Sequence, residues 1–458
     1  MKTKNLIRNF LFVLFVLGSM TIHAQKIYVN RSNGLPVEFN IADIDSISFN
    51  PDIRSQSVEL TSPIKENTTL RDLGLPIDYY FNGNELDVQN NAILTIEPGV
   101  TIQFRNAGGF LYIQDGATLK AIGTPDKHIR FIGAVNDKGS WRGIEIYTGW
   151  TSDDRKNELS YVEILNAGSQ NYNYSAALYL DNNGKIAVTN SLIDGSSSNG
   201  IDIYDTSQGI TELTSFSNNT VSNCGKAPIR TDYDAGPYDM RNMDNTNTFT
   251  GNGEEYIHCA NGDVVNTFGS NLTLRNLNGY PWYFEYGINL AGDQNLTVEP
   301  GAVLIMGNNS RVYIPTNSHF IADGTAAAHI TIKGFRNEAG YWYGFQIWSL
   351  TVGTKLNFCD ISDGGGETTY MSSVYMGTGS APGSNAYLKI NNTTISNSLR
   401  YGMHLWDYNY KDENCIISST NPASVIFTDC QLGNIYSNCD PNGYAIYPDL
   451  SSTCNLSN

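Results

Sequence analysis

The sequence predicts an all-β protein, a right-handed parallel β-helix in two duplicated halves with a small β module at its N-terminus. From about Ser57 onward, short strand-like runs of apolar residues follow one another with almost no helical periodicity. Gly, Asn, Asp and Pro separate these runs, as expected for strands joined by tight turns. In addition, two long stretches of the chain repeat at a distance of about 200 residues, which is typical of repeat architectures.

The duplication is visible in the residues themselves. The stretch Thr69–Phe81 (TLRDLGLPIDYYF) returns as Thr273–Phe284 (TLRNLNGYPWYF), and Leu94–Gly99 returns as Leu296–Gly301. Matched landmarks follow each copy: Gly123 and Gly324, His128 and His329, Gly133 and Gly334, Trp141 and Trp342, and Gly143 and Gly344. We interpret the residues that are identical in both copies as structural, so the two tryptophans are expected to close the corners of coils. Exposed positions at which the two copies differ are candidates for ligand contact.

The N-terminus has the sequence pattern of an export signal. Three basic residues precede the apolar run Phe10–Ile22, and small residues before Gln25 offer a cleavage site. The run is too short to span a bilayer, so residues 1–24 are predicted to be a secretory signal peptide. We expect an exported protein in the extracellular space, at the cell surface or in the periplasm, without membrane insertion.

Three further segments follow the signal. Lys26–Asn50 alternates apolar and polar residues around a turn at Asn33–Gly34, which predicts a small N-terminal β module over residues 25–52. Residues 57–265 are predicted to form the first β-helix half, and residues 266–458 the second.

The spacing of similar strands favours a solenoid over a β-sandwich. The strand centres Ile144, Val162, Leu178 and Ile201 lie 18, 16 and 23 residues apart. We expect each coil to supply one strand to a parallel sheet, with β-branched and Leu side chains inside.

Charge and cysteine content narrow the classes of partner and site. Acidic residues outnumber basic ones by 45 to 28, and the formal net charge is −17. Because no basic cluster remains after the predicted signal peptide to neutralise phosphates, nucleic acid and anionic membranes are expected to be poor partners. No C-x-x-C pair is present, so no cysteine metal site is expected.

Seven cysteines in an exported chain predict disulfide bonds. Two bridges are expected among four cysteines near the C-terminus, with three connectivities open: Cys415, Cys430, Cys439 and Cys454. A third bridge is expected between Cys224 and Cys259. Cys359 occupies an apolar strand position and is expected to be a small buried hydrophobic residue.

Strand alternation predicts which side chains face outward. In the first half the predicted outward column is Glu145, Glu163, Tyr179 and Asp202, flanked by Tyr147 and Tyr204. In the second half it is Gln346, Asp360, Tyr375 and His404, flanked by Trp348 and Trp406. Aromatic faces beside carboxylates or amides suit sugar rings, so we predict a ladder that binds an extended glycan or another surface partner. The alternative is an ordinary solvated β surface.

Several segments also resemble a known family. LTIEPGVTIQF, GATLKAIGTPDKHIRFIG, GSWRGIEIY and NSLIDGSSSNGI look like the secreted right-handed parallel β-helix repeat proteins of Gram-negative bacteria, within the pectate-lyase-like architecture. The similarity covers essentially residues 57–450. It implies the fold, but the architecture hosts lyases, hydrolases and adhesins alike. Of the polygalacturonase-like pattern only Asp153–Asp154 is present. A pectate-lyase-like site would need an Arg base and acidic residues on Ca²⁺, for which Arg230 beside Asp232 and Asp234 is the candidate.

The leading prediction is a protein without catalytic activity, and the alternative is a polysaccharide lyase or glycoside hydrolase. If Glu145 and Glu163 lie one rung apart, they approach the spacing of about 5 Å of retaining glycosidases, and Glu163 with Asp202 approaches the wider inverting spacing. No cofactor is expected, and Ca²⁺ is the ion to consider for the Arg230 region.

Overall fold

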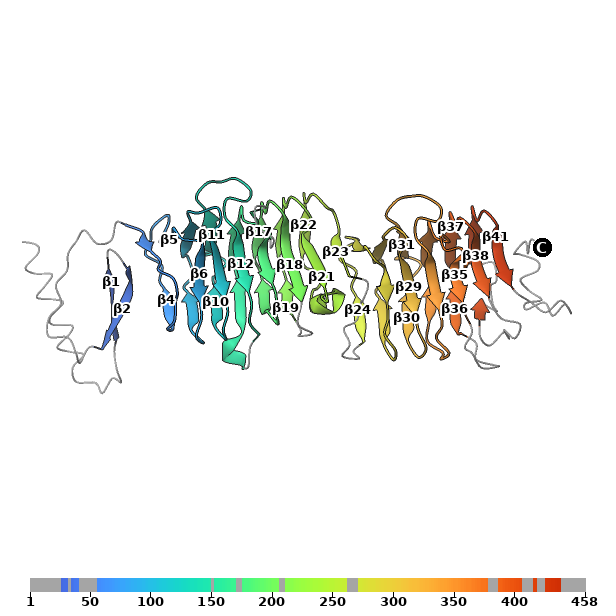
Figure 1. Cartoon of the computed structure of the whole chain (residues 1–458), viewed down its shortest axis with the longest axis horizontal. Coiled ribbons are helices and arrows are strands. Elements are labelled where there is room, and N and C mark those ends of the chain that lie inside the picture. Colours follow the sequence, from blue (N-terminus) through green and yellow to red (C-terminus); the bar gives the residue numbers. More distant parts are fainter. Residues whose placement is uncertain are drawn as a thin grey trace, which may run out of the picture.

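The computed structural model describes residues 26–31, 34–40, 56–149, 152–169, 175–205, 211–261, 271–377, 386–405, 415–417 and 425–437. These residues are almost entirely β-structure, and their strands stack into long parallel sheets (Figure 1). The arrangement is compatible with a parallel β-helix. The predicted signal peptide lies outside the described residues, and no helix within those ranges is long and apolar enough to cross a membrane.

The first two strands are antiparallel, unlike the rest. Strands β1 (Lys26–Arg31) and β2 (Gly34–Asn40) pair so that Lys26 stands opposite Asn40. They fall within the segment for which a small N-terminal β module is predicted. That this segment is a separate domain stays a prediction.

Three parallel sheets surround the core of the first half. The six-stranded sheet contains β4 (Thr68–Leu70), β7 (Ile93–Ile96), β10 (Thr118–Ile122), β13 (Asn157–Ser160), β16 (Lys185–Thr189) and β19 (Glu212–Ser217). The eight-stranded sheet contains β3 (Val58–Glu59), β5 (Tyr79–Phe81), β8 (Thr101–Phe104), β11 (Ile129–Gly133), β14 (Val162–Leu165), β17 (Leu192–Asp194), β20 (Thr220–Ser222) and β22 (Thr248–Thr250).

The third sheet, here called the long sheet, continues into the second half. In the first half it contains β6 (Glu85–Val88), β9 (Phe110–Ile113), β12 (Gly143–Ile146), β15 (Ala176–Leu180), β18 (Asn199–Asp205), β21 (Ile229–Tyr233) and β23 (Ile257–Cys259). It continues with β25 (Trp282–Phe284), β28 (Val303–Met306), β31 (Ile330–Gly334), β34 (Cys359–Ser362), β37 (Thr393–Ser396) and β40 (Val425–Thr428).

Two further parallel sheets complete the second half. One contains β24 (Leu272–Leu274), β27 (Asn295–Val298), β30 (His319–Asp323), β33 (Lys355–Asn357), β36 (Leu388–Asn391) and β39 (Cys415–Ile417). The other, here called the second-half sheet, contains β26 (Ile288–Asn289), β29 (Arg311–Ile314), β32 (Gly344–Ile347), β35 (Ser372–Met376), β38 (Tyr401–Leu405) and β41 (Gly433–Ser437). Two short 3₁₀-helices, η3 (Asp153–Arg155) and η4 (Pro237–Met240), interrupt the first half.

Consecutive strands belong to different sheets, which corrects the predicted spacing. Ile144 pairs with Leu178, 34 residues later, and Leu178 pairs with Ile201. Val162, which was predicted to lie between them, instead pairs with Ile129 of the eight-stranded sheet. The predicted rung spacing was wrong because each coil supplies a strand to each of three sheets before it returns to the first.

The interior is built by strand alternation, as predicted. One continuous apolar core runs from Val58 to Ile435. Alternation places the residues on either side of each outward position of the second half inside, and all eight are buried: Phe345, Ile347, Cys359, Ile361, Val374, Met376, Met403 and Leu405. Each fully buried large apolar side chain contributes about 1.5–3 kcal/mol relative to an exposed one, so stacking of coils stabilises the solenoid.

The matched tryptophans and glycines lie at equivalent corners. Trp141 and Trp342 are fully buried, and their indole N–H groups donate to the carbonyl oxygens of Leu165 (2.9 Å) and Ser362 (2.7 Å). Gly143 has a φ of +133°, and a Cβ there would lie 2.5 Å from a carbonyl oxygen of the next coil. A side chain has no room at this corner.

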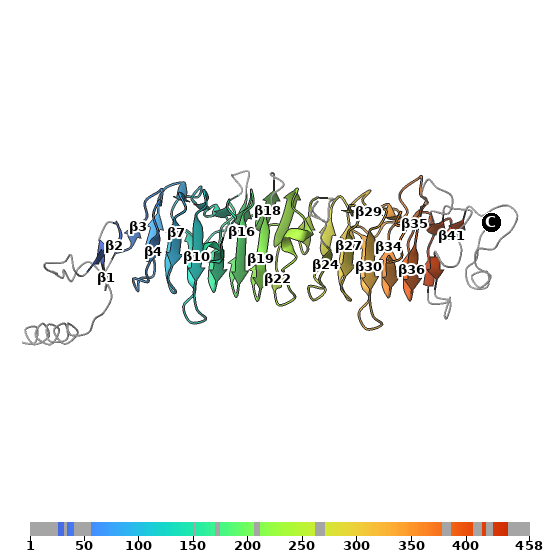
Figure 2. The same cartoon turned by 90° about the horizontal axis from the view of Figure 1, so that it is seen from below.

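The long sheet joins the two predicted halves end to end. Strand β23 pairs with β21 on one side and with β25 on the other, so the coils share one axis (Figure 2). Trp282–Phe284 repeats Tyr79–Phe81 in sequence, yet Tyr79–Phe81 belongs to the eight-stranded sheet. The coils of the second half are therefore rotated about the solenoid axis by one sheet: the strands that continue the long sheet correspond in sequence to those of the eight-stranded sheet. The predicted boundary at residue 265 lies outside the described residues.

The cysteine prediction fails where the structure tests it. Cys224 and Cys259 are buried and free, because Cys224 follows a strand of the eight-stranded sheet whereas Cys259 lies in the long sheet. Cys359 is fully buried, as predicted, and Cys430 is also free. Cys439, Cys454 and the side chain of Cys415 lie outside what the structure describes.

Candidate functional site

A column of polar and aromatic side chains crosses the long sheet. Its members occupy directly opposed positions on eight neighbouring strands: Asp87, Tyr112, Glu145, Tyr179, Asp202, Arg230, His258 and Tyr283. Seven steps of about 4.8 Å give the column a length of about 34 Å. The column includes four of the predicted site residues, and it extends beyond them into the second half.

The first part of the column is buried. Glu145 is 9% exposed, and its Oε2 atom lies 2.8 Å from Nη2 of Arg142. The Arg142 guanidinium lies over the Phe110 ring, 4.0 Å from its centroid. Burial raises the pKa of Glu145 to about 7, and the charge of Arg142 opposes that shift. The neighbouring Tyr179 is 4% exposed.

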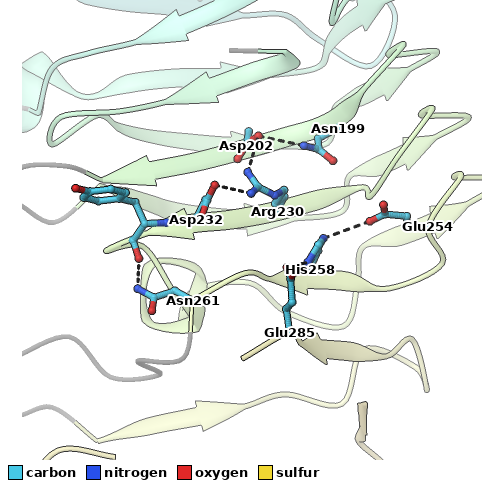
Figure 3. Close-up of polar contacts among 9 residues, drawn as sticks. Asn199, Asp202, Arg230, Asp232, Glu254, His258, Asn261 and Glu285 are labelled. Atoms are coloured by element: carbon cyan, nitrogen blue, oxygen red, sulfur yellow. Dashed lines mark hydrogen bonds and ion pairs between the residues drawn. The ribbon is translucent and has the colours of Figure 1, made fainter. Parts of the chain in front are cut away.

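The middle of the column is a charged network on two adjacent strands (Figure 3). Oδ2 of Asp202 accepts a hydrogen bond from the Asn199 amide (3.0 Å) and lies 3.5 Å from Nη1 of Arg230. Arg230 also forms an ion pair with Asp232. Asp202 is 7% exposed, and burial raises its pKa to about 6. Arg230 therefore has two carboxylate partners, Asp202 and Asp232.

Next to this network, His258 is held between two glutamates (Figure 3). Its Nδ1 atom lies 3.3 Å from Oε2 of Glu254, and its Nε2 atom lies 2.9 Å from Oε2 of Glu285. The hydrogen bond to His258 is the main cause that lowers the pKa of Glu254. Both ring nitrogens of His258 thus have a carboxylate partner.

Aromatic rings surround the charged groups at this end of the column. The ring of Tyr283 packs against those of Tyr256 (4.8 Å between centroids) and Phe335 (5.1 Å). The ring of Tyr233 lies 5.4 Å from that of Tyr204. We call this region the junction strip and define it by Tyr204, Arg230, Asp232, Tyr233, Glu254, Tyr256, His258, Tyr283, Glu285, Tyr286 and Phe335.

Three rings of the junction strip face solvent. Phe335, Tyr233 and Tyr286 are 47%, 56% and 63% exposed. Tyr233 also has a φ of +62°, a left-handed conformation that is an outlier for a bulky residue. Most large apolar and aromatic side chains of this solenoid are inside, so exposed rings at one place on the surface are a feature to explain.

Glu163 does not belong to this column. It lies in β14 of the eight-stranded sheet, where its carboxylate contacts Nδ1 of His128 (3.1 Å) and Nε of Arg130 (3.1 Å). The predicted pairs of Glu163 with Glu145 and with Asp202 are therefore wrong, because consecutive strands enter different sheets. Asp360 likewise lies away from its predicted neighbours, in β34 of the long sheet, 3.1 Å from Nδ1 of His329.

The second half has a corresponding column on the second-half sheet. Its directly opposed residues are Tyr313, Gln346, Tyr375, His404 and Tyr436. The predicted residues Tyr375 and His404 are present, but they are 2% and 0% exposed. The Trp348 ring packs against that of Tyr375 at 5.5 Å. Trp406 lies outside the described residues.

The two columns lie on different sheets, so they do not form one continuous ladder. The remaining predicted residue, Tyr147, packs against Tyr112 at 5.9 Å between ring centroids, beside the buried part of the first column. His258, Tyr283, Glu285 and Phe335 were not predicted. The apolar–polar–apolar pattern of Ile257–Cys259 signals a strand, but only the register places His258 beside Arg230.

A separate groove lies at the end of the eight-stranded sheet. It has a volume of about 390 Å³ and is lined by Phe249, Tyr280, Asn247, Thr248 and Glu255 among others. No group of three or more His, Cys, Asp or Glu side chains is placed to hold a metal ion in the part of the chain that the structure describes. The Ca²⁺ prediction for the Arg230 region stays a prediction.

Comparison with protein-family models, curated proteins and solved structures finds no match for the chain. The candidate site is therefore defined by its own geometry. The junction strip combines exposed rings, paired carboxylates and a guanidinium on neighbouring strands.

Proposed function

We propose that this protein is an exported, surface-located right-handed parallel β-helix with two duplicated halves, and that it binds an extended glycan without cleaving it. The observation that carries the proposal is the junction strip. From β18 to β25 it crosses three strand-to-strand steps of about 4.8 Å, or about 14 Å, and the Phe335 ring after β31 packs back against Tyr283. A strip of this length matches several sugar units of a polymer better than a single small molecule.

The chemistry of the strip suits sugars. The exposed faces of Tyr233, Tyr286 and Phe335 can cover the apolar C–H faces of sugar rings. Between them, the carboxylates of Asp232 and Glu285 and the guanidinium of Arg230 supply acceptors and donors for hydroxyl groups. Because these polar groups are held by one another, they are already oriented before a ligand arrives.

Burial supports binding over catalysis. Glu145 and Asp202 are two strands apart, a backbone separation of about 9.6 Å, which is at the upper limit of the range of about 6.5–9.5 Å between the carboxyl groups of inverting glycosidases. Both residues are buried, at 9% and 7% exposed, and their carboxyl groups are ion-paired, so a sugar chain cannot reach them in this conformation. Arg230 is paired with two carboxylates, unlike a free base of a lyase.

The second candidate function is a polysaccharide lyase or glycoside hydrolase. The observation that favours it is the raised pKa of Glu145, about 7, which suits a general acid at neutral pH. If the protein is such an enzyme, the buried carboxyl groups must become accessible when substrate binds.

The proposals that the protein is exported and that its solenoid is right-handed rest on the N-terminal sequence and on the general handedness of parallel strand connections. The basic residues and apolar run before Gln25 support a signal peptide. Right-handed crossovers account for nearly all parallel strand connections, which supports a right-handed solenoid. The repeated stretches support two duplicated halves, each of which would present its own column.

The test is incubation of the purified mature protein with a panel of polysaccharides. Retention of the protein on an immobilised polymer and the release of new reducing or unsaturated ends are both measured. We expect retention on at least one polymer and no new ends. New ends would support the enzyme, and absence of both would contradict glycan recognition.

A double variant locates the binding site. Tyr286→Ala with Phe335→Ala removes two exposed rings, and we expect about tenfold weaker retention or more. The control is Val352→Ala, which removes an 80% exposed side chain outside the strip and should not change retention. Equal retention by all three proteins would exclude the junction strip as the site.

A further inference from the structure

The junction strip is acidic, and its cations already have partners. Four carboxyl groups lie on or beside it, those of Asp202, Asp232, Glu254 and Glu285. The guanidinium of Arg230 contacts the first two, and the imidazole of His258 contacts the other two. These six side chains comprise four carboxyl groups, one guanidinium and one imidazole, so negative charge outnumbers positive charge whether or not His258 carries a proton.

The negative charge reaches the exposed rings. Tyr286 is the most exposed aromatic side chain of the strip, and the charge of the neighbouring Glu285 is the main cause that raises the pKa of its hydroxyl group. Asp232 acts on the same hydroxyl in the same direction, and Arg230 opposes it. A ligand group that contacts Tyr286 therefore enters a negative potential.

Other cations lie at the margins of the strip. Lys226 is close enough to Glu254 to help lower its pKa. Lys333 is in register with Ile305, which follows Tyr283 in the column, so it lies two strands beyond that ring. Arg336, next to Phe335, lies 3.9 Å from the carboxylate of Glu338. Within the described residues, the carboxyl groups of Asp202, Asp232, Glu254 and Glu285 make their ion pairs with Arg230 and His258 and not with these three groups.

We propose that the junction strip selects an uncharged glycan and excludes polymers of uronic acids or sulfated sugars; this inference rests on the proposed function. A carboxylate or sulfate on each sugar unit would face the carboxylates of the strip, where Arg230 and His258 are already paired. A like charge placed beside these carboxylates costs more binding free energy than a solvent-exposed ion pair gains, so repulsion decides specificity. The formal net charge of −17 adds repulsion at long range. The aromatic faces act equally on neutral sugars and supply the attraction.

The experiment compares polymers that differ in charge. Retention of the mature protein is measured on an uncharged glucan, an uncharged mannan, polygalacturonate and a sulfated galactan. Each polymer is tested at about 0.02 M and about 0.5 M salt, because the higher concentration shortens the Debye length and screens repulsion between exposed charges. We expect retention on an uncharged polymer at both salt concentrations. We expect at least tenfold weaker retention on both anionic polymers at low salt, with a smaller difference at high salt.

A charge variant tests the cause. Asp232→Asn with Glu285→Gln removes two negative charges without changing side-chain size, and we expect the ratio of anionic to neutral retention to rise at least fivefold. Asp153→Asn removes an exposed charge in η3, outside the strip, and should leave the ratio unchanged. An unchanged ratio in the double variant would mean that the strip does not set specificity.

The outcomes separate the two proposals. Stronger retention on polygalacturonate or sulfated galactan than on neutral polymers would overturn the specificity inference and leave glycan binding standing. Retention on none of the polymers would overturn glycan binding and the inference together. Self-association through the strip, seen as a dimer that Tyr286→Ala abolishes, would assign the surface to a second copy of the chain and overturn both.

Discussion

At the scale of single residues, burial raises the pKa of several acidic groups in the first half. Glu145, Asp181, Asp202 and Asp239 are all buried, and burial is the main cause that raises the pKa of each. Taking a carboxylate out of water disfavours its charged form. Each of these groups therefore binds a proton more tightly in the folded protein than in the unfolded chain.

Asp239 gives the clearest test of this effect. It lies in η4, is 1% exposed, and its Oδ2 atom accepts a hydrogen bond from the Gly236 N–H (2.8 Å). Burial raises its pKa to about 7 from an ordinary value of about 3.9. The contribution of Asp239 to the free energy of unfolding is thus most favourable below about pH 4 and is lost as the pH rises through about 7.

We expect Asp239→Asn to be more stable than the wild type at pH 8 by up to about 4 kcal/mol, and the difference to shrink toward pH 5. Asn keeps the acceptor for Gly236 but has no charge to bury. Urea unfolding at the two pH values measures the effect, with Asp153→Asn as the exposed control. A variant that loses stability at pH 8 would show that the Asp239 charge is compensated in the fold.

At the scale of the structural element, the coil corners set the path of the chain. The corner at Gly143 needs both a left-handed backbone and a missing side chain, because Ala176 and Ala177 carbonyl oxygens lie 2.5 Å and 2.6 Å from the position of a Cβ. Gly344 has the same features, with carbonyl oxygens of Ser373 and Ser372 at 2.5 Å and 2.8 Å. These contacts are with backbone atoms, so they cannot relax by a change of rotamer.

Gly143→Ala should therefore destabilise the protein by about 1–3 kcal/mol, from the left-handed backbone alone, and by more if the next coil is displaced. The matched control is Gly292→Ala, because nothing lies within 4 Å of a Cβ at that position. Chemical denaturation of both variants measures the difference. Equal stability of the two would contradict the steric account of the corner.

The alternation of side chains along a strand does not by itself predict which residues are exposed to solvent. Tyr179, Gln346 and His404 occupy the positions predicted to face outward, yet all three are buried. Facing away from the core of the solenoid is thus not the same as contact with solvent. For this reason the exposed rings of the strip could be recognised only in the folded protein.

At the scale of the whole molecule, the long sheet makes one body of the two predicted halves. Strand β23 connects coils of the first half to β25, and Ile257 within it is fully buried. In solenoids, stability is approximately a sum of terms for single repeats and for contacts between neighbours. The link between the halves is therefore only as stable as the contacts of β23.

Ile257→Ala should weaken this link, at a cost of about 2–5 kcal/mol. Amide hydrogen exchange measured by mass spectrometry should show faster exchange in β21, β23 and β25, while strands near both ends keep their protection. Ile113→Ala, equally buried in β9, should instead affect the first coils. Uniform loss of protection along the chain would indicate a single cooperative unit and contradict this prediction.

Much of the fold and part of the site were predictable. Parallel stacking, the inward set from Phe345 to Leu405 and the buried corner of Trp141 follow from local patterns. The adjacency of Tyr179 and Asp202 in register is also correct. Placing Glu163 beside Glu145 was wrong, and His258 was missed, because adjacency across coils depends on how many residues each coil uses.

The sequence by itself determined which side of each strand is apolar, since side chains alternate at every second residue and that period is local. It also determined the repeat, because duplicated residues can be matched without coordinates. Only the tertiary structure decided which strands are neighbours, that the coils of the second half are rotated by one sheet, and that rings from β18 to β31 gather at the junction. These features depend on contacts between residues far apart in the chain, and packing of whole coils, rather than any local pattern, selects them.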